Sequence, residues 1–227
     1  MLKKTIYAII IQEADYTVSL ICGGCRMFRM DKWYLQGWLY FGALVPLTLL
    51  LPDWWGKENG IVENLQLLWL LAGMVYCWRM RLAKQTILTE NASKIWSAGI
   101  IYFFLLFMRE ISWGRVFFTN ASGGMLEYQQ MGLYGKLVHP MVAALIILAL
   151  VLIVKAKIWH ILKRIKLPIK SFTLLLLFIG MSWIGERGSI PILHSQVLEE
   201  LAEFGAYMMM YYIVKDLGSR LKITKEL

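Results

Sequence analysis

The sequence predicts an all-α, polytopic membrane protein, a bundle of about six transmembrane helices with both termini in the cytoplasm. Of its 227 residues, 59% are hydrophobic and 17% are charged, which is too apolar for an ordinary soluble domain. The net charge is +9, but the basic residues form short clusters between apolar runs. That distribution is typical of membrane topology and argues against a nucleic-acid partner.

The first 32 residues form a cytoplasmic or interfacial segment. Their apolar runs are interrupted by Glu13 and Asp15, so neither reaches the roughly 20 residues that a span needs. No small-residue cleavage site follows a clean apolar core, so we expect no removable signal peptide. Met27 and Met30 immediately precede the first span, and residues 1–29 are therefore a candidate upstream extension of the reading frame.

Tryptophans, prolines and polar turns mark the limits of the spans. Trp33 and Trp54 bracket the first one, as aromatic belts at a membrane surface do. His139 and Pro140 open the fourth, because proline is best tolerated in the first turn of a helix. A basic cytoplasmic tail covers residues 217–227. The expected spans are about 33–55, 61–78, 95–118, 138–154, 171–185 and 196–214.

Lysine and arginine gather before span one and after spans two, four and six. All four clusters lie on one side if there are six spans, and the positive-inside rule assigns that side to the cytoplasm. The sequence thus predicts a multi-pass protein of the bacterial inner membrane. The polar ends of the helices then face the periplasm.

The segment 107–118 places charged residues and a serine at the end of an apolar run. Ionisable residues inside a span are costly and are usually functional. Under the six-span topology, polar residues from five spans reach a similar outer-leaflet depth, which is how a site within a helix bundle is built. The group contains Glu63, Arg109, Glu110, Ser112, Arg115, His139, Glu186, Arg187, His194, Glu199, Glu200 and Glu203.

We assign provisional roles by residue chemistry. Glu110 precedes Trp113, a marker of the interface, and is the deepest carboxylate of its span, which suits acid or base work. The two histidines open spans four and six on the same side, so they are candidate ligands of a divalent metal together with Glu110. The catalytic candidates are Glu110, Ser112, His139 and Glu186. The candidate substrate-binding residues are Arg109, Arg115, Arg187, Glu63, Glu199 and Glu203, and the metal candidates are His139, His194 and Glu110.

A simpler interpretation of the same residues is also open. Helix ends near a membrane surface often carry charges that reach water or pair with one another. Arg109 with Glu199, and Arg187 with Glu203, are pairs of this kind. Glu199, Glu200 and Glu203 also suit the start of a helix, where negative charge is favourable.

The residues Glu110-Ile111-Ser112-Trp113-Gly114-Arg115, with Gln129-Gln130 and His139 after them, resemble a family of uncharacterised bacterial inner-membrane proteins. That family has a Glu-Glu-x-Ser-Trp-Gly-Gln box and a Gln-rich connection to a Leu-His pair. Arg109 and Arg115 depart from the box, and Val138 and Pro140 flank the histidine here. The resemblance covers about 30 residues and implies no known reaction. It singles out Glu110, Ser112, Trp113 and His139.

Three classes of function fit these observations. The first is an acid/base or metal-assisted enzyme that acts on a lipid or lipid-linked anionic substrate, whose anionic group the arginines would hold. The second is a non-enzymatic ligand-binding or proton-coupled transport protein. The third is a membrane subunit or sensor of a larger complex. Membrane lipids are the expected partners in each case, with a second copy of the chain or another protein as further candidates.

Overall fold

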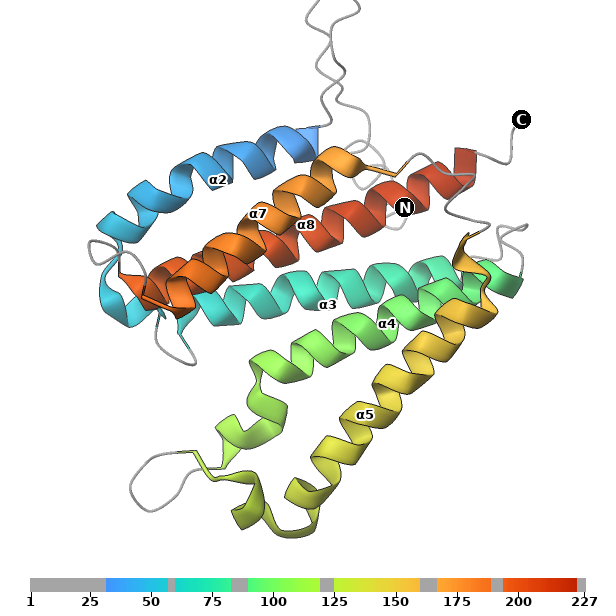
Figure 1. Cartoon of the computed structure of the whole chain (residues 1–227), viewed down its shortest axis with the longest axis horizontal. Helices are drawn as coiled ribbons and strands as arrows, with labels where there is room; N and C mark the ends of the chain where they lie inside the picture. Colours follow the sequence, from blue (N-terminus) through green and yellow to red (C-terminus); the bar gives the residue numbers. More distant parts are fainter. Residues whose placement is uncertain are drawn as a thin grey trace, which may run out of the picture.

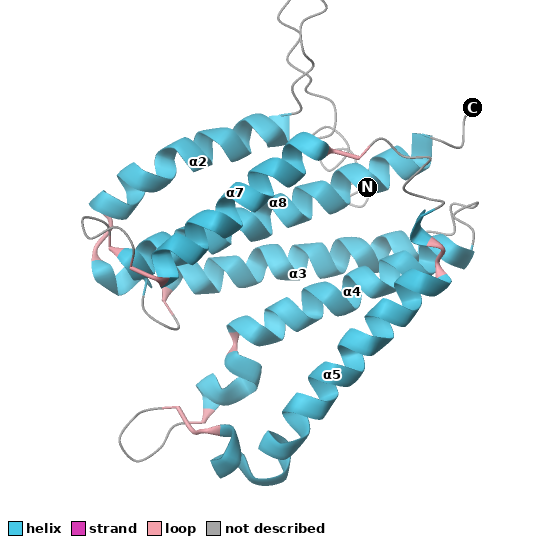
Figure 2. Cartoon of the chain, viewed as in Figure 1, coloured by secondary structure: helices cyan, strands magenta, loops and turns pink. Residues whose placement is uncertain are grey.

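The described part of the chain is built entirely from helices. The structure is a computed structural model, and it describes residues 32–56, 60–82, 90–118, 125–159, 167–188 and 194–223. Figure 2 shows helices and connecting loops without strands in these ranges. The all-helical prediction is confirmed. The helices are α2 (Lys32–Leu50), α3 (Ile61–Leu82), α4 (Glu90–Glu110), α5 (Gly132–Lys155), α7 (Ile169–Glu186) and α8 (Ser195–Ile223), with 3-10 turns η1 (Asp53–Gly56), η2 (Ser112–Phe117) and η3 (Tyr128–Met131).

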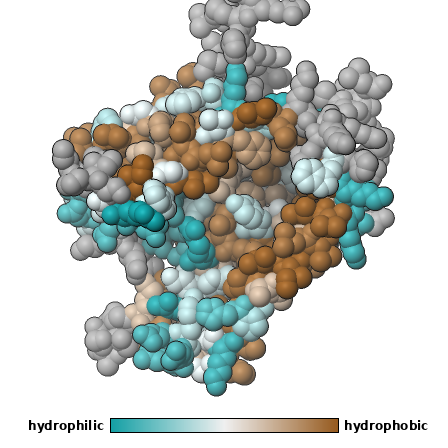
Figure 3. All heavy atoms as spheres, in the orientation of Figure 1, coloured by the Kyte–Doolittle hydropathy of each residue, from teal (hydrophilic) through white to brown (hydrophobic). Residues whose placement is uncertain are grey.

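Four of the described helices are long and apolar enough to cross a membrane. They are Ile61–Leu82, Asn91–Glu110, Tyr128–Lys155 and Ile169–Glu186. Because lipid offers no hydrogen-bond partners, such segments satisfy their backbone groups internally as helices. Apolar side chains cover the surface along α5 in Figure 3, where a soluble protein would carry polar ones. The chain is therefore a membrane protein of the helical class.

The helix α8 is the centre of the bundle. It packs against α2, α3 and α7, as Figure 1 shows, and it contributes residues to all three apolar clusters of the described core. Met209 joins the cluster with α2 and α7, Tyr207 the one with α3 and α4, and Val197 the one beside η1. Since its neighbours shield it, α8 can carry polar residues that a lipid-facing helix could not.

Successive helices run in alternating directions, so that α3 and α8 begin where α4 and α7 end (Figure 1). The polar residues at these four helix ends therefore lie at one end of the molecule, on the left in Figure 1. The helix α5 packs on α4 and diverges from the rest of the bundle toward η3.

Three helix limits differ from the sequence prediction. The expected third span reached residue 118, but α4 ends at Glu110. The helix α5 begins at Gly132, so Pro140 lies inside it rather than in its first turn. The helix α8 continues to Ile223 through most of the expected basic tail. The N-terminal segment, apart from Lys32, lies outside the described residues.

Candidate functional site

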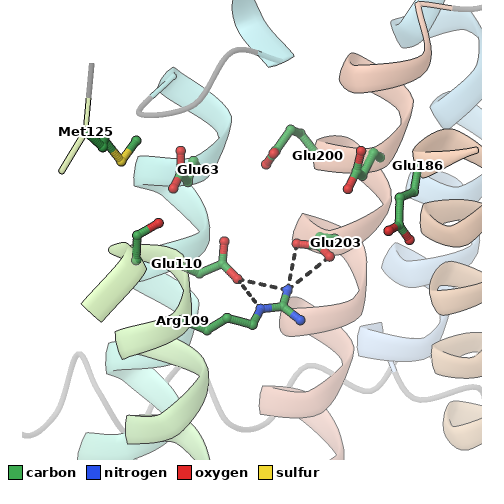
Figure 4. A pocket seen from close by; sticks show the side chains of 9 residues that line it. Glu63, Arg109, Glu110, Met125, Glu186, Glu200 and Glu203 are labelled. Atoms are coloured by element: carbon green, nitrogen blue, oxygen red, sulfur yellow. Dashed lines mark hydrogen bonds and ion pairs between the residues drawn. The ribbon is translucent and has the colours of Figure 1, made fainter. Parts of the chain in front are cut away.

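A pocket of about 350 Å³ opens at the end where α3 and α8 begin and α4 and α7 end. All four helices contribute to its wall, and Ser112 and Met125 complete the lining (Figure 4). Six of the nine lining residues are glutamates, whereas one is an arginine. The lining residues are Glu63, Arg109, Glu110, Ser112, Met125, Glu186, Glu199, Glu200 and Glu203.

The Ser-Trp-Gly sequence ends α4 and sets the position of Glu110. Ser112, Trp113 and Gly114 have φ values of 46°, 53° and 81°, which belong to the left-handed region and stop a right-handed helix. Glycine adopts that region without strain, which accounts for Gly114. The buried Trp113 stacks edge-on against Phe104, and its carbonyl accepts a 2.6 Å hydrogen bond from the Tyr134 hydroxyl. The turn is thus fixed from two sides.

Arg109 links two carboxylates from different helices. Its Nη2 lies 3.0 and 2.9 Å from the two carboxylate oxygens of Glu203 on α8. Its Nε and Nη2 lie 3.0 and 2.9 Å from Oε1 of Glu110. Nη2 also donates a 2.6 Å hydrogen bond to the Tyr207 hydroxyl. The guanidinium therefore connects the end of α4 to the third turn of α8.

Glu110 is held through one oxygen only. Its Oε1 also accepts a 2.6 Å hydrogen bond from the Tyr207 hydroxyl, in addition to the contacts with Arg109. The other oxygen points away from Arg109 in Figure 4, and Glu110 lines the pocket. With 8% of its surface exposed, Glu110 is one of three buried polar residues in the described chain. The arrangement presents a fixed carboxylate oxygen to the pocket.

Glu200 is held by α3. The side-chain amide of Gln66 donates from Nε2 to the Glu200 carbonyl, at 2.9 Å, and to its Oε2, at 2.8 Å. Gln66 has no exposed surface. Glu63 precedes Gln66 by three residues, so both lie on the face of α3 that meets α8.

The close approach of α7 to α8 depends on Gly185. A Cβ at this position would lie 2.7 Å from the Glu199 backbone nitrogen and 2.9 Å from the Ser195 carbonyl oxygen. Only a residue without a side chain fits there. Glycine thereby brings Glu186, the next residue, to the same pocket as Glu199.

The structure brings together most of the residues that the sequence proposed. Eight members of the predicted group line one pocket, although they come from four helices and the turn after α4. The pairing differs from the expected one, because Arg109 contacts Glu110 and Glu203 rather than Glu199. The eight are Glu63, Arg109, Glu110, Ser112, Glu186, Glu199, Glu200 and Glu203.

The remaining candidates lie elsewhere. His139 is exposed and stacks edge-on against Tyr128, with ring centroids 5.3 Å apart. His194 pairs through Nδ1 with the Asp53 carboxylate in η1. The prediction that both histidines join Glu110 at a metal is not matched by this arrangement. Among the described residues, no three His, Cys, Asp or Glu side chains are grouped so as to hold a metal ion.

The two other arginines of the predicted site, Arg115 and Arg187, face neighbouring aromatic rings. The guanidinium of Arg115 lies 4.9 Å from the Tyr128 ring centroid, and its Nε donates to the Leu126 carbonyl. The guanidinium of Arg187 lies 4.0 Å from the Trp183 ring, in place of the expected pair with Glu203. Cation–π contacts at such distances are favourable for arginine.

Comparison with known proteins gives no assignment. No family model, curated protein or solved structure matches the chain. The resemblance of the Glu110–Arg115 box to an inner-membrane family remains a prediction, and the site is interpreted from its own geometry.

Sequence reasoning missed Tyr207 and left Gln66 out of the site. Tyr207 follows Glu203 by four residues, a spacing that places both on one face of α8, so helical periodicity contains the signal. Gln66 shares a face with Glu63 in the same way. Neither side chain carries a charge at neutral pH, so a prediction built on charged residues does not include them.

Proposed function

We propose that this protein binds a cationic ligand in the carboxylate pocket, as a ligand-binding or cation-coupled transport protein of the membrane. One observation carries the proposal: six glutamates and a single arginine line the pocket, and two of the glutamates already pair with that arginine. Within the pocket lining, this one arginine cannot balance the charge of six carboxylates. In a partly buried site such charge requires a cation or bound protons.

The same charge balance disfavours an anionic lipid substrate. Such a substrate needs guanidinium groups turned toward it. Arg109 is engaged by Glu110 and Glu203, while Arg115 and Arg187 stack on aromatic rings. A phosphate entering the pocket would therefore meet carboxylates first.

An acid/base role for Glu110 is the second candidate. It is supported by the short hydrogen bond from Tyr207 and by the oxygen of Glu110 that points away from Arg109. A base needs an oxygen within reach of a substrate proton, and this geometry offers one. Replacement of Glu110 by Gln would abolish turnover of an amine or lipid substrate under this hypothesis, and unchanged turnover would reject it.

The packing of α2 and α8 supports a proposal of six membrane spans, two more than the four apolar helices alone. The helix α2 packs on α7 and α8 beside the four apolar helices, and α8 lies among them. With about 1.5 Å of rise per residue, the 29 residues of α8 extend about 43 Å, enough to cross a bilayer. We therefore propose six spans with both termini in the cytoplasm of a bacterial inner-membrane protein. The pocket would then face the periplasm.

Calorimetric titration of the purified protein tests the sign of the ligand charge. The probes are n-butylammonium and Mn²⁺ as cations and glycerol 3-phosphate as an anion, each at the same ionic strength so that screening is equal. We expect saturable binding of at least one cation and none of the anion. Binding of glycerol 3-phosphate alone, or of no probe, would contradict the proposed function.

A further inference from the structure

Two successive residues with side chains have a left-handed backbone directly after α4. Ser112 and Trp113 have φ values of 46° and 53°, and Gly114 continues the run at 81°. Residues other than glycine visit this region rarely and singly, because their Cβ crowds the following carbonyl oxygen. A strained run of this kind persists only where surrounding contacts hold it, and it is typical of sites and switch segments.

The left-handed run decides whether Ser112 belongs to the pocket. Ser112 and Glu110 line the same pocket, although they are only two residues apart. On a right-handed helix that spacing turns two side chains about 200° from each other, so they would not face the same side. The sequence permits such a continuation, because Gly114 is the one poor helix former in residues 111–118. Two backbone states of this segment therefore differ in one wall of the pocket.

Hydroxyl groups from η3 and α5 hold the left-handed state. Tyr134, at the start of α5, donates a 2.6 Å hydrogen bond to the Trp113 carbonyl. Tyr128, in η3, donates to the Ser112 carbonyl at 3.4 Å. A continued α-helix would direct both carbonyls along its axis toward the amides four residues later. The helix and the two hydroxyl contacts are therefore alternatives.

The elements that carry these hydroxyls form one unit with few anchors. A Cβ at Gly135 would overlap the Tyr128 carbonyl, so η3 lies flush against the first turn of α5. The helix α5 packs on α4 and diverges from the rest of the bundle (Figure 1). Within α5, which is described throughout, only Gly135 and Val138 are buried. A shift of α5 on α4 would draw both hydroxyls away from the turn.

We propose that residues 111–115 form a two-state switch of the pocket, which α5 controls through Tyr134 and Tyr128. With α5 seated on α4, the two hydroxyls hold the left-handed turn and Ser112 lines the pocket. When α5 shifts, α4 continues as a right-handed helix and carries Ser112 to its opposite face. The inference goes beyond the proposed cation binding, because it concerns the shape of the pocket whatever the pocket binds.

Thiol labelling at position 112 reports the state of the switch. The variant Ser112→Cys is made with Cys22→Ser and Cys25→Ser, so that the other thiol is the buried Cys77. It is placed in lipid nanodiscs and labelled with a water-soluble maleimide that does not enter the bilayer. Gln129→Cys, at an exposed residue of η3 outside the pocket, is the control position. We expect both positions to react, and an unreactive position 112 would contradict the left-handed state.

The variant Tyr134→Phe tests the hydroxyl that holds the turn. Loss of one hydrogen bond shifts a two-state equilibrium by up to about tenfold, so we expect labelling at position 112 to slow several-fold and labelling at the control position to stay the same. The matched control is Tyr76→Phe, which removes a hydroxyl that donates to the Lys215 carbonyl. An unchanged rate at position 112 would overturn the switch. A faster rate, which a loosened turn would give, would overturn it as well.

The variant Val138→Ala tests the control by α5. Val138 follows Tyr134 by four residues and shares its face, so the substitution weakens the packing of α5 but leaves the hydroxyls in place. We expect it to slow labelling at position 112, whereas Met141→Ala, at an exposed residue of α5, should have no effect. Equal rates in these two variants would overturn the control by α5.

The variant Gly114→Ala tests the backbone equilibrium without changing α5. Alanine disfavours the left-handed state and favours a helix, so labelling at position 112 should slow as it does in Tyr134→Phe. Unchanged labelling would overturn the two-state turn, even if the α5 variants did not fold. These experiments use no ligand, so their failure would leave the proposed cation binding standing, and the calorimetric titration decides that proposal separately.

Discussion

The variant Tyr207→Phe isolates the hydroxyl that joins the two helices of the site. Tyr207 is 3% exposed, and phenylalanine keeps its ring and most of its volume. The hydroxyl donates to Glu110 Oε1 and accepts from Arg109 Nη2, each at 2.6 Å. The substitution therefore removes two hydrogen bonds with charged partners and leaves the apolar packing of α8 in place.

The expected cost follows from the contacts that remain. A hydrogen bond to a charged group contributes about 1.5–3 kcal/mol. Glu110 Oε1 keeps its contacts with Arg109 at 3.0 and 2.9 Å, so no acceptor is left unpaired. We therefore expect a loss of about 2 kcal/mol in the free energy of unfolding, below the sum of two such bonds.

Reversible unfolding in mixed detergent and dodecyl sulfate measures this loss. The matched control is Tyr40→Phe, because the Tyr40 hydroxyl donates to the neutral Leu201 carbonyl at 2.8 Å and its removal should cost about 1 kcal/mol. In a Glu110→Gln background the cost of Tyr207→Phe should shrink, which shows that the two groups are coupled. A Tyr207→Phe loss no greater than that of Tyr40→Phe would refute the role given to the charged network.

Three further predictions follow from the backbone and the carboxylates. Gly185→Ala should destabilise the protein and weaken cation binding, because the new Cβ meets the Glu199 backbone at 2.7 Å. The control Gly180→Ala has open space around it and should be neutral or stabilising in the same unfolding assay. Gly114→Ala should cost about 1 kcal/mol of unfolding free energy, since its φ of 81° is strained for alanine; an unchanged stability would argue against the left-handed turn. Lowering the pH should weaken butylammonium binding in calorimetry as the carboxylates take up protons, and affinity that rises in acid would contradict an electrostatic site.

The sequence predicted the class of fold because membrane helices are specified locally. Apolar length and helix formation follow from the absence of water in the bilayer, and both can be read from any one segment. The end of α4 was misplaced by eight residues because Ile111–Phe118 is still mostly apolar, and hydropathy does not register the positive φ values of Ser112 to Gly114. Backbone conformation, rather than polarity, ends this helix.

The sequence predicted the membrane depth at which the polar residues lie, but not which of the helices that carry them are neighbours. Topology assigned the polar ends to one side of the membrane, and most of them do line one pocket. Which helices are neighbours cannot be read from depth alone. His139 was therefore grouped with Glu110 although α5 carries it to Tyr128, and His194 was included although Asp53 lies next to it. The Arg187–Trp183 contact, in contrast, follows from a spacing of four residues.

The affinity of a pocket variant for a cation tests the central claim most directly. Calorimetry would compare butylammonium binding by the wild-type protein with that of Glu200→Gln, and with Glu127→Gln as a control on an exposed glutamate outside the pocket. We predict at least about tenfold weaker binding for Glu200→Gln and unchanged binding for Glu127→Gln. Equal affinity of all three proteins would show that the carboxylate pocket does not bind the cation.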